Sequence, residues 1–134
     1  MSLMIPTNVS VDVYRTANPA SPYTFGTLSA SGVRGFLRPA ARDGRFGAAS
    51  WLKWTHVLLV PPATDVRDAY NSQLDPGRNN TLADTVVLTD TNLSTTKTAF
   101  YVVFVEQASR GTAAAHLRVY LDRFAPNTWP TNAL

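Results

Sequence analysis

Side chains capable of acid–base chemistry are few in this sequence and widely spaced. They comprise eight aspartates, the single glutamate Glu106, and two histidines, His56 and His116. General acid–base catalysis requires such groups to converge in a cleft, and no local spacing brings these together. We therefore predict no catalytic residues and no enzymatic activity.

Metal and nucleophile motifs are missing from the sequence as well. The chain has no cysteine, and its histidines do not stand in the H-x-H or H-x-x-x-H spacing that brings two imidazoles to one zinc ion. No G-x-S-x-G, Walker A or G-x-G-x-x-G sequence occurs. We predict neither a metal nor a cofactor, and a fold held by packing rather than by disulfides.

A basic cluster is the first candidate binding site. Its members are Arg34, Arg38, Arg42, Arg45 and Lys53, and the only acidic residue among them is Asp43. Phe36, Phe46, Trp51 and Trp54 are interleaved with them. Such residues can neutralise phosphates and stack on bases, or anchor a protein interface. A third interpretation is that the aromatic residues are core and the arginines simply solvated.

The second candidate is the charged segment that follows Pro61 and Pro62, in which Asp65, Arg67 and Asp68 lie close together. At a subunit boundary, opposite charges fix register more than they add affinity. The alternative is a solvated rim with surface ion pairs worth about 0–1 kcal/mol.

The elements that would position these residues are short strands. Residues 8–15 alternate, with Val9, Val11 and Val13 on one face and polar residues on a solvent-facing side. Residues 114–124 alternate in the same way. Other strands are predicted at 33–39, 51–60, 84–88 and 98–107, of which 51–60 and 98–107 are apolar on both faces and should be central.

Turn-rich segments separate these strands. Proline and glycine predict loops over 16–23 and 38–50, with a short helix around 39–43 as an alternative, and a dense turn signal occupies 71–84. Six or so short strands in 134 residues indicate a single all-β domain, a sandwich or a small barrel. No window approaches the roughly 18 apolar residues of a membrane span, so we expect a soluble protein without membrane contact.

Four segments of the sequence follow one another in an order that is similar to that of a known protein family. "WTHVLLVPPATDVRDAYN", "DTVVL", "FYVVFVEQ" and "HLRVYLDR" follow one another between residues 54 and 123. This order resembles the head–tail joining proteins of tailed bacteriophages, the adaptor or stopper (head-closure) subunits. In that family a strand runs into a D-[IV]-R-[DE] corner, a short strand begins near an Asp, and a Y-x-V strand pairs with an H-x-[RK]-x-[YL] strand.

The resemblance implies a small antiparallel SH3-like barrel of about six strands, with long loops and extended termini. It implies a structural virion protein, present in the host cytoplasm during assembly, that forms a homo-oligomeric ring between portal or adaptor and tail proteins. Asp65, Arg67 and Asp68 would support subunit contacts. The loop 38–50, with Arg38, Arg42, Arg45 and Lys53, would face DNA in the channel or a neighbouring ring.

The ends of the chain are predicted to be flexible arms. Residues 1–8 and 125–134, with Trp129 as an anchor, would order only on assembly. An isolated subunit is then expected to stay monomeric, because the cost of ordering an arm is recovered only when the ring forms. Two other hypotheses remain: a nucleic-acid-binding barrel that uses residues 34–54, and a carbohydrate-binding barrel with Trp51 or Trp54 as a stacking platform.

Overall fold

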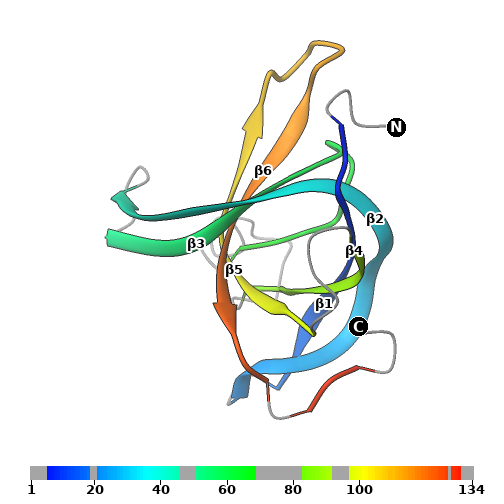
Figure 1. The fold of residues 1–134 in the computed structure, drawn as a ribbon, viewed down its shortest axis with the longest axis vertical. Helices are drawn as coiled ribbons and strands as arrows, with labels where there is room; N and C mark the ends of the chain where they lie inside the picture. Colours follow the sequence, from blue (N-terminus) through cyan, green and yellow to red (C-terminus); the bar gives the residue numbers. More distant parts are fainter. Residues whose placement is uncertain are drawn as a thin grey trace.

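The computed structural model describes residues 6–18, 21–45, 51–68, 83–91, 97–126 and 128–130, and for 16–18, 21–24, 41–45, 51–52 and 90–91 the backbone alone. The strands are β1 (Val9–Asn18), β2 (Ser21–Arg45), β3 (Trp51–Val60), β4 (Thr85–Thr91), β5 (Ala99–Ala108) and β6 (His116–Phe124). They pair antiparallel in the closed order β1-β2-β3-β6-β5-β4 (Figure 1). The predicted all-β fold, a small antiparallel barrel of six strands, is confirmed.

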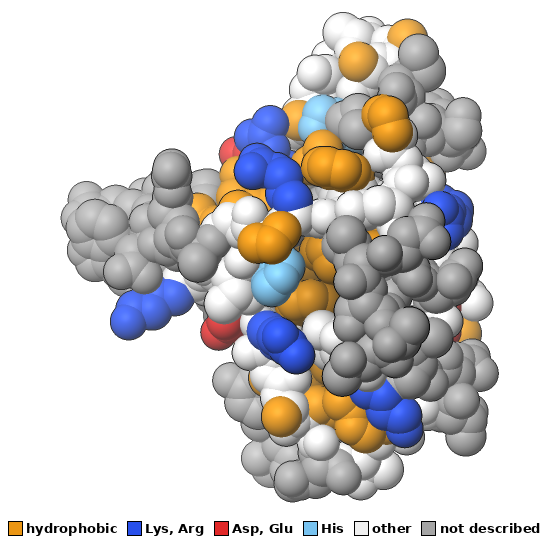
Figure 2. Space-filling view, in the orientation of Figure 1, with side chains coloured by type: hydrophobic (Ala, Val, Ile, Leu, Met, Phe, Trp, Pro, Cys, Tyr) orange, Lys and Arg blue, Asp and Glu red, His pale blue; other side chains and the backbone are white. Residues whose placement is uncertain are grey.

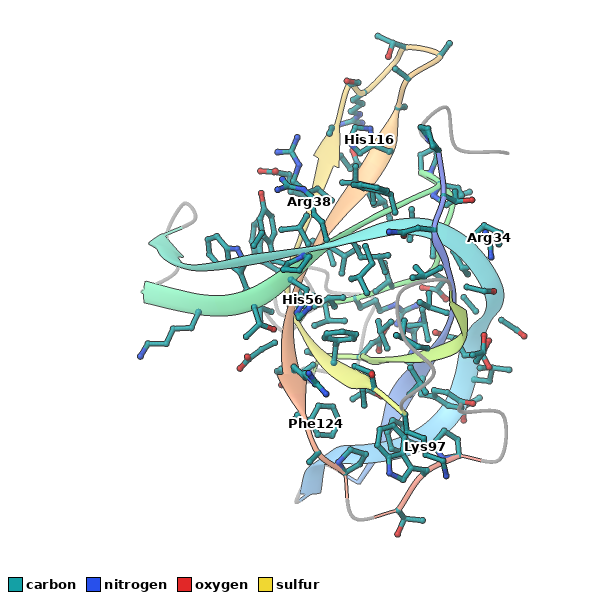
Figure 3. The ribbon with its side chains drawn as sticks, in the orientation of Figure 1. Arg34, Arg38, His56, Lys97, His116 and Phe124 are labelled. Carbon is teal, nitrogen blue, oxygen red and sulfur yellow. The ribbon has the colours of Figure 1, made fainter. Side chains whose placement is uncertain are left out.

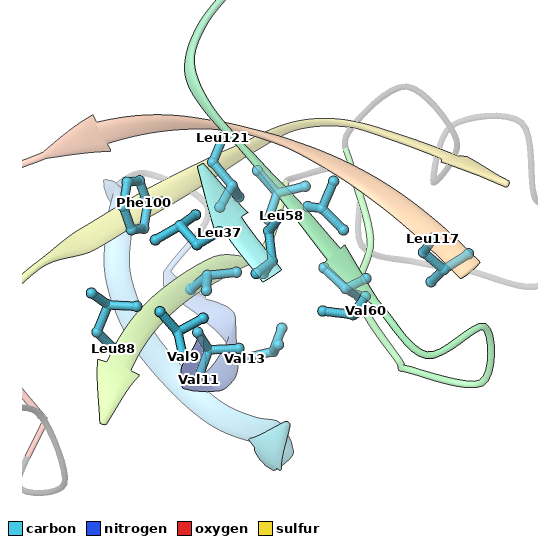
Figure 4. Packing of buried hydrophobic residues seen from close by; sticks show 14 of the residues in the cluster. Val9, Val11, Val13, Leu37, Leu58, Val60, Leu88, Phe100, Leu117 and Leu121 are labelled. Carbon is cyan, nitrogen blue, oxygen red and sulfur yellow. The ribbon is translucent and has the colours of Figure 1, made fainter. Parts of the chain in front are cut away.

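The barrel interior is filled by alternate residues of the strands (Figure 4). On β1, Val9, Val11 and Val13 point inward and are almost fully buried, and Leu58 and Val60 of β3 meet them. The inward residues of β6 are Leu117, Val119 and Leu121, as the alternation predicts. Each fully buried Val or Leu contributes about 1.5–3 kcal/mol, so this interior is the main source of stability.

The outer side of β1 differs from the prediction. Ser10, Asp12 and Tyr14 were expected to face solvent, yet all three are buried. Asp12 accepts a hydrogen bond of 2.8 Å from the backbone N–H of Gly32, and Tyr14 packs edge-on against Phe25. Burial, together with the nearby Asp12 carboxylate, raises the pKa of Tyr14. Both faces of β1 are therefore covered.

Strand β2 is much longer than predicted, with 25 residues. Its first part pairs with β1 from Ser21 to Gly35, and its second part pairs with β3 from Phe36 to Arg45. Register shifts interrupt both ladders, and such bulges let a long strand bend around a barrel. The loop predicted over 16–23 is therefore wrong for 16–18 and 21–23, which are strand; residues 19–20 lie outside the described residues.

Two contacts fix where β2 passes from one neighbour to the next. A Cβ on Gly35 would lie 2.7 Å from the carbonyl oxygen of Leu59, so only glycine allows this approach. Asn8 ends the ladder of β1, because its side chain donates to the carbonyl of Leu37 at 2.9 Å and accepts from the N–H of Leu37 at 2.8 Å.

Two hairpins extend beyond the closed part of the barrel (Figure 1). Pairing of β2 with β3 continues to Arg45 and Trp51, whereas β1 leaves β2 at Gly35 and β6 reaches β3 only at His56. We call residues 40–45 and 51–55 the β2–β3 ribbon. The loop or helix predicted over 38–50 is wrong for residues 38–45, which are strand; residues 46–50 lie outside the described residues.

The second projection is the end of the β5–β6 hairpin, residues 108–116, beyond the last residues of β6 that pair with β3. Its tip turns through positive φ at Ser109 (53°) and Gly111 (80°). Thr112 holds the turn, since its hydroxyl donates to the Ser109 carbonyl at 2.7 Å. This confirms the turn predicted around Gly111.

Candidate functional site

The charged corner after β3 packs against the barrel core through one apolar residue. Pro61 and Pro62 end the strand, and the N–H of Thr64 donates to the Pro61 carbonyl in a turn. Val66 then enters the core between strands. The corner therefore acts as a plug, with its apolar residue in the core and charged residues on its other side. This explains why charged residues follow directly after an apolar strand.

An ion network fastens this plug. Arg15 on β1 contacts Asp84 through Nη1 and Asp65 through Nη2, the latter at 2.6 Å. The backbone N–H of Arg67 donates to Asp84 Oδ2 at 2.8 Å, and Arg67 Nε lies 3.4 Å from Asp65. The network thus joins the corner to β1 and to the start of β4.

The two carboxyl groups of the network titrate differently. Burial raises the pKa of Asp84 to about 6, although Arg15 opposes the shift. Asp84 is fully buried, and its Oδ1 has no hydrogen-bond partner within the described part of the chain. Burial also disfavours the charge on Asp65, but the side chain is half exposed, and Arg15 and Arg67 hold its pKa below the usual value. Desolvation dominates only where water is fully excluded.

Asp68 has a separate role in holding β5. It is fully buried, and its Oδ2 accepts a hydrogen bond of 2.6 Å from the N–H of Val105. This contact lies within the subunit. Asp65 is exposed and Arg67 half buried at the same corner, and the role of all three residues in a subunit contact stays a prediction.

The predicted basic cluster is divided by the fold: Arg42, Arg45 and Lys53 lie on the β2–β3 ribbon and Arg38 at its base, whereas Arg34 pairs with β1 on the other side of the barrel (Figure 3). Arg38 and Lys53 are exposed. Arg42 and Arg45 pair through the backbone with Trp54 and Trp51, and their side chains lie outside the described residues. Lys and Arg side chains are spread over this face of the molecule, with little acidic surface in view among the described residues (Figure 2).

A groove lies at the base of the ribbon on the outer face of β2, β3 and β6. It has a volume of about 450 Å³. Its lining residues are Arg38, Pro39, Ala40, Trp54, Val57, Leu59, Arg118 and Tyr120. The buried members Trp54, Val57 and Tyr120 form an apolar cluster on the outside of the barrel, so β3 is covered on both faces, as its sequence predicts.

Glu106 organises one wall of this groove. Its Oε1 accepts from Arg118 Nη1 at 2.7 Å and from the Tyr120 hydroxyl at 3.0 Å. A hydrogen bond with Tyr120 raises the pKa of Arg118, and Glu106 adds to this effect. Burial raises the pKa of Tyr120, so the hydroxyl stays protonated near neutral pH. The guanidinium group of Arg118 is therefore held in place beside the apolar cluster of the groove.

Trp129 belongs to a third place on the surface. It packs, half buried, against the cluster of Tyr14, Val87 and Ala99, and Lys97 Nζ lies 5.9 Å from its ring centroid. Of the predicted arms, residues 125–126 and 128–130 are described at one end and 6–8 at the other. Within this chain Trp129 therefore contacts its own barrel, and its role in subunit contacts stays a prediction.

The two histidines do not converge. His56 faces Leu121 across the β3–β6 ladder, whereas His116 faces Ala108 across the β5–β6 ladder (Figure 3). The His56 ring lies edge-on to Phe100 at 4.9 Å, and burial, with Arg123 nearby, lowers its pKa. His116 Nδ1 lies 2.9 Å from the Ala114 carbonyl oxygen. Each histidine thus has a local structural contact.

Sequence reasoning missed several residues of these sites. Arg15 and Asp84 are 69 positions apart, and nothing in their local sequence indicates that they meet. Arg118 and Tyr120 could have been identified from the sequence, because both lie on the outward face of a strand whose residues alternate between apolar and polar.

Comparisons with known proteins give no family. No family model, no curated protein and no solved structure matches this chain. In the described ranges no helix is long and apolar enough to cross a membrane. The same residues contain no group of three or more His, Asp or Glu side chains that could hold a metal ion.

Proposed function

We propose that this protein is a structural virion subunit, a head–tail connector or head-closure protein of a tailed bacteriophage, which forms a ring between portal and tail. The observation that carries the proposal is the basic β2–β3 ribbon, which continues past the last residues that pair with β1 and β6. A two-stranded hairpin is at best marginally stable in water on its own. A ribbon of this kind is stabilised when a partner covers it.

The charges on the ribbon favour a foreign partner over uncontrolled self-pairing. Open strand edges invite edge-to-edge association, and exposed charges and proline oppose it. Arg38, Pro39 and Lys53 are all exposed where the ribbon leaves the barrel. These residues support docking onto an acidic protein surface or onto a polyanion.

The β5–β6 projection supports ring formation. Its exposed tip, residues 109–114, extends from the barrel away from the ribbon (Figure 1), and the pair Glu106–Arg118 braces its base. A ring requires that one patch of a subunit dock onto a different patch of the next copy. Two projections in different directions suit such a heterologous contact.

The resemblance to head–tail joining proteins adds the biological setting. The segments that carry the resemblance, residues 54–123, include β4, β5 and most of β3 and β6. In this setting the protein acts in the virion, with portal or adaptor and tail proteins as partners, and performs no catalysis.

Electron microscopy of the purified chain, alone and mixed with portal protein from the same genome, tests this function. We expect rings or portal-bound density, and loss of both for the charge reversals Arg38→Glu with Lys53→Glu. The control Arg34→Glu, on the opposite side of the barrel (Figure 3), should assemble normally. Consistent failure of the unaltered chain to bind portal, tail or itself would refute the proposal.

A second candidate function is an independent nucleic-acid-binding module. The exposed Arg38 and Lys53 favour it. It requires DNA binding that weakens steeply with salt, because phosphate contacts release counterions. Filter binding at two salt concentrations, with Arg38, Arg42 and Arg45 changed to Ala, tests it; binding that these changes leave unaltered eliminates this function.

A further inference from the structure

We propose that the groove at the base of the ribbon binds an extended acidic segment of a partner protein, with its carboxylates on Arg38 and Arg118. This inference rests on the proposed docking function and names the chemistry of the partner. The groove draws its walls from three neighbouring strands, β2, β3 and β6. Its volume of about 450 Å³ lies within the range of ordinary ligand pockets.

The floor of the groove is apolar, although it lies on the outside of the barrel. Trp54, Val57 and Tyr120 are buried there, and Leu59 and Ala40 pack against them half buried. An outward face of a solvated strand normally carries polar residues. An apolar floor with a charged rim is the composition of a protein-binding surface, in which a central apolar contact is surrounded by polar groups.

The rim supplies the charge that an acidic partner would match. Arg118 is fixed by Glu106, which accepts from Nη1 at 2.7 Å, and it keeps further N–H groups for an incoming acceptor. Arg38 is exposed, and its side chain has no ion pair or hydrogen bond with any described residue. Because guanidinium groups bind carboxylates in bidentate geometry, the two arginines provide a preformed and only partly neutralised carboxylate site.

The same geometry argues against a nucleic acid at this site. Sequence-independent binding of single strands stacks bases on open aromatic faces. Trp54 and Tyr120 are only 7% and 9% exposed, and their ring centroids lie 4.8 Å apart, so each ring is already covered. For the same reason Trp54 cannot serve as the stacking platform of a carbohydrate site. Leu59 and Ala40 are only half buried, so the floor still offers apolar surface to an aliphatic side chain, with a carboxylate at the rim.

Fluorescence anisotropy with labelled probes tests the inference. The probes are the heptapeptide Gly-Asp-Leu-Asp-Leu-Asp-Gly, the same peptide with Asn in place of Asp, and a twelve-nucleotide oligo-dT. We expect the acidic peptide to bind at least tenfold more tightly than the amide peptide, because a hydrogen bond to a charged group contributes about 1.5–3 kcal/mol. Arg38→Gln or Arg118→Gln should weaken binding about tenfold or more, and the control Arg34→Gln less than twofold.

Other outcomes overturn the inference. Equal binding of the acidic and amide peptides, no binding of either, or equal losses in Arg38→Gln and Arg34→Gln would each remove the groove as a carboxylate site. Tighter binding of oligo-dT that Arg38→Gln abolishes would assign the surface to nucleic acid. The ring assay separates this test from the proposed function, since rings that form without peptide binding refute the groove alone, and peptide binding without any assembly refutes the connector role alone.

Discussion

The buried carboxyl group of Asp84 should make the protein more stable at pH 5 than at pH 7 through this one residue. Burial raises its pKa to about 6 in the folded state, whereas an aspartate in an unfolded chain has a pKa of about 3.9. Between these values the folded state binds the proton that the unfolded state has lost. By linkage, the free energy of unfolding therefore increases as the pH falls through 6.

The magnitude follows from the two pKa values. A shift of roughly two units corresponds to about 3 kcal/mol in total. Nearly half of this, about 1.3 kcal/mol, appears between pH 7 and pH 5, and the rest appears below pH 5. His56 acts in the opposite direction, because burial lowers its pKa, and the stability it contributes is lost as the pH falls below 6.5. The pH profile of the unaltered protein alone is therefore not diagnostic.

The variant Asp84→Asn isolates the effect, since its amide cannot titrate in this range and its carbonyl oxygen can still accept from the N–H of Arg67. Urea denaturation of both proteins at pH 7, 6 and 5 gives the free energy of unfolding at each pH. We expect the advantage of the unaltered protein over the variant to grow by about 1.3 kcal/mol from pH 7 to pH 5. If that advantage stays constant or shrinks, the ion pair with Arg15 outweighs desolvation and the reasoning is wrong.

Three further changes test the packing contacts. Gly35→Ala should lower the free energy of unfolding by about 1–3 kcal/mol, because its Cβ would lie 2.7 Å from a carbonyl oxygen of β3; an unchanged urea midpoint would contradict this. Asp68→Ala removes the acceptor for a backbone N–H of β5 and should cost about 1–3 kcal/mol, with faster hydrogen exchange at that amide as its signature. Trp129→Ala should lower the melting temperature by several degrees, whereas Leu28→Ala, at an exposed position, should not; equal effects would mean that the tryptophan contributes little.

The strands that were predictable are those with uninterrupted periodicity. Val9, Val11 and Val13 alternate without a break, and the core alternation of β6 is equally regular. Strand β2 was largely missed because glycine and proline occur along it, and these residues usually mark loops. Here they serve a long strand that must bend: Gly32 adopts a φ of 61° beside Asp12, and Gly35 admits the backbone of β3.

The contacts of the sites were predictable only where one hairpin contains both partners. In a hairpin the register follows from the turn, and a turn centred near Gly111 brings Glu106 opposite Arg118, as observed. The network of Arg15 and Asp84 depends instead on how distant strands close the barrel. No local pattern encodes that closure.

The closed barrel and its projections differ in whether their strand edges are paired. Closure of six strands removes exposed sheet edges, and the interior needs no partner to be complete. The β2–β3 ribbon then creates two new edges outside the closed region, and its Trp54 and Ala40 pack in the outer cluster rather than in the barrel interior. Exposed charges at Arg38 and Lys53 keep these edges from pairing with one another. Such an extension is stabilised when a surface of opposite charge covers it, and the partner-binding role that we propose rests on this requirement.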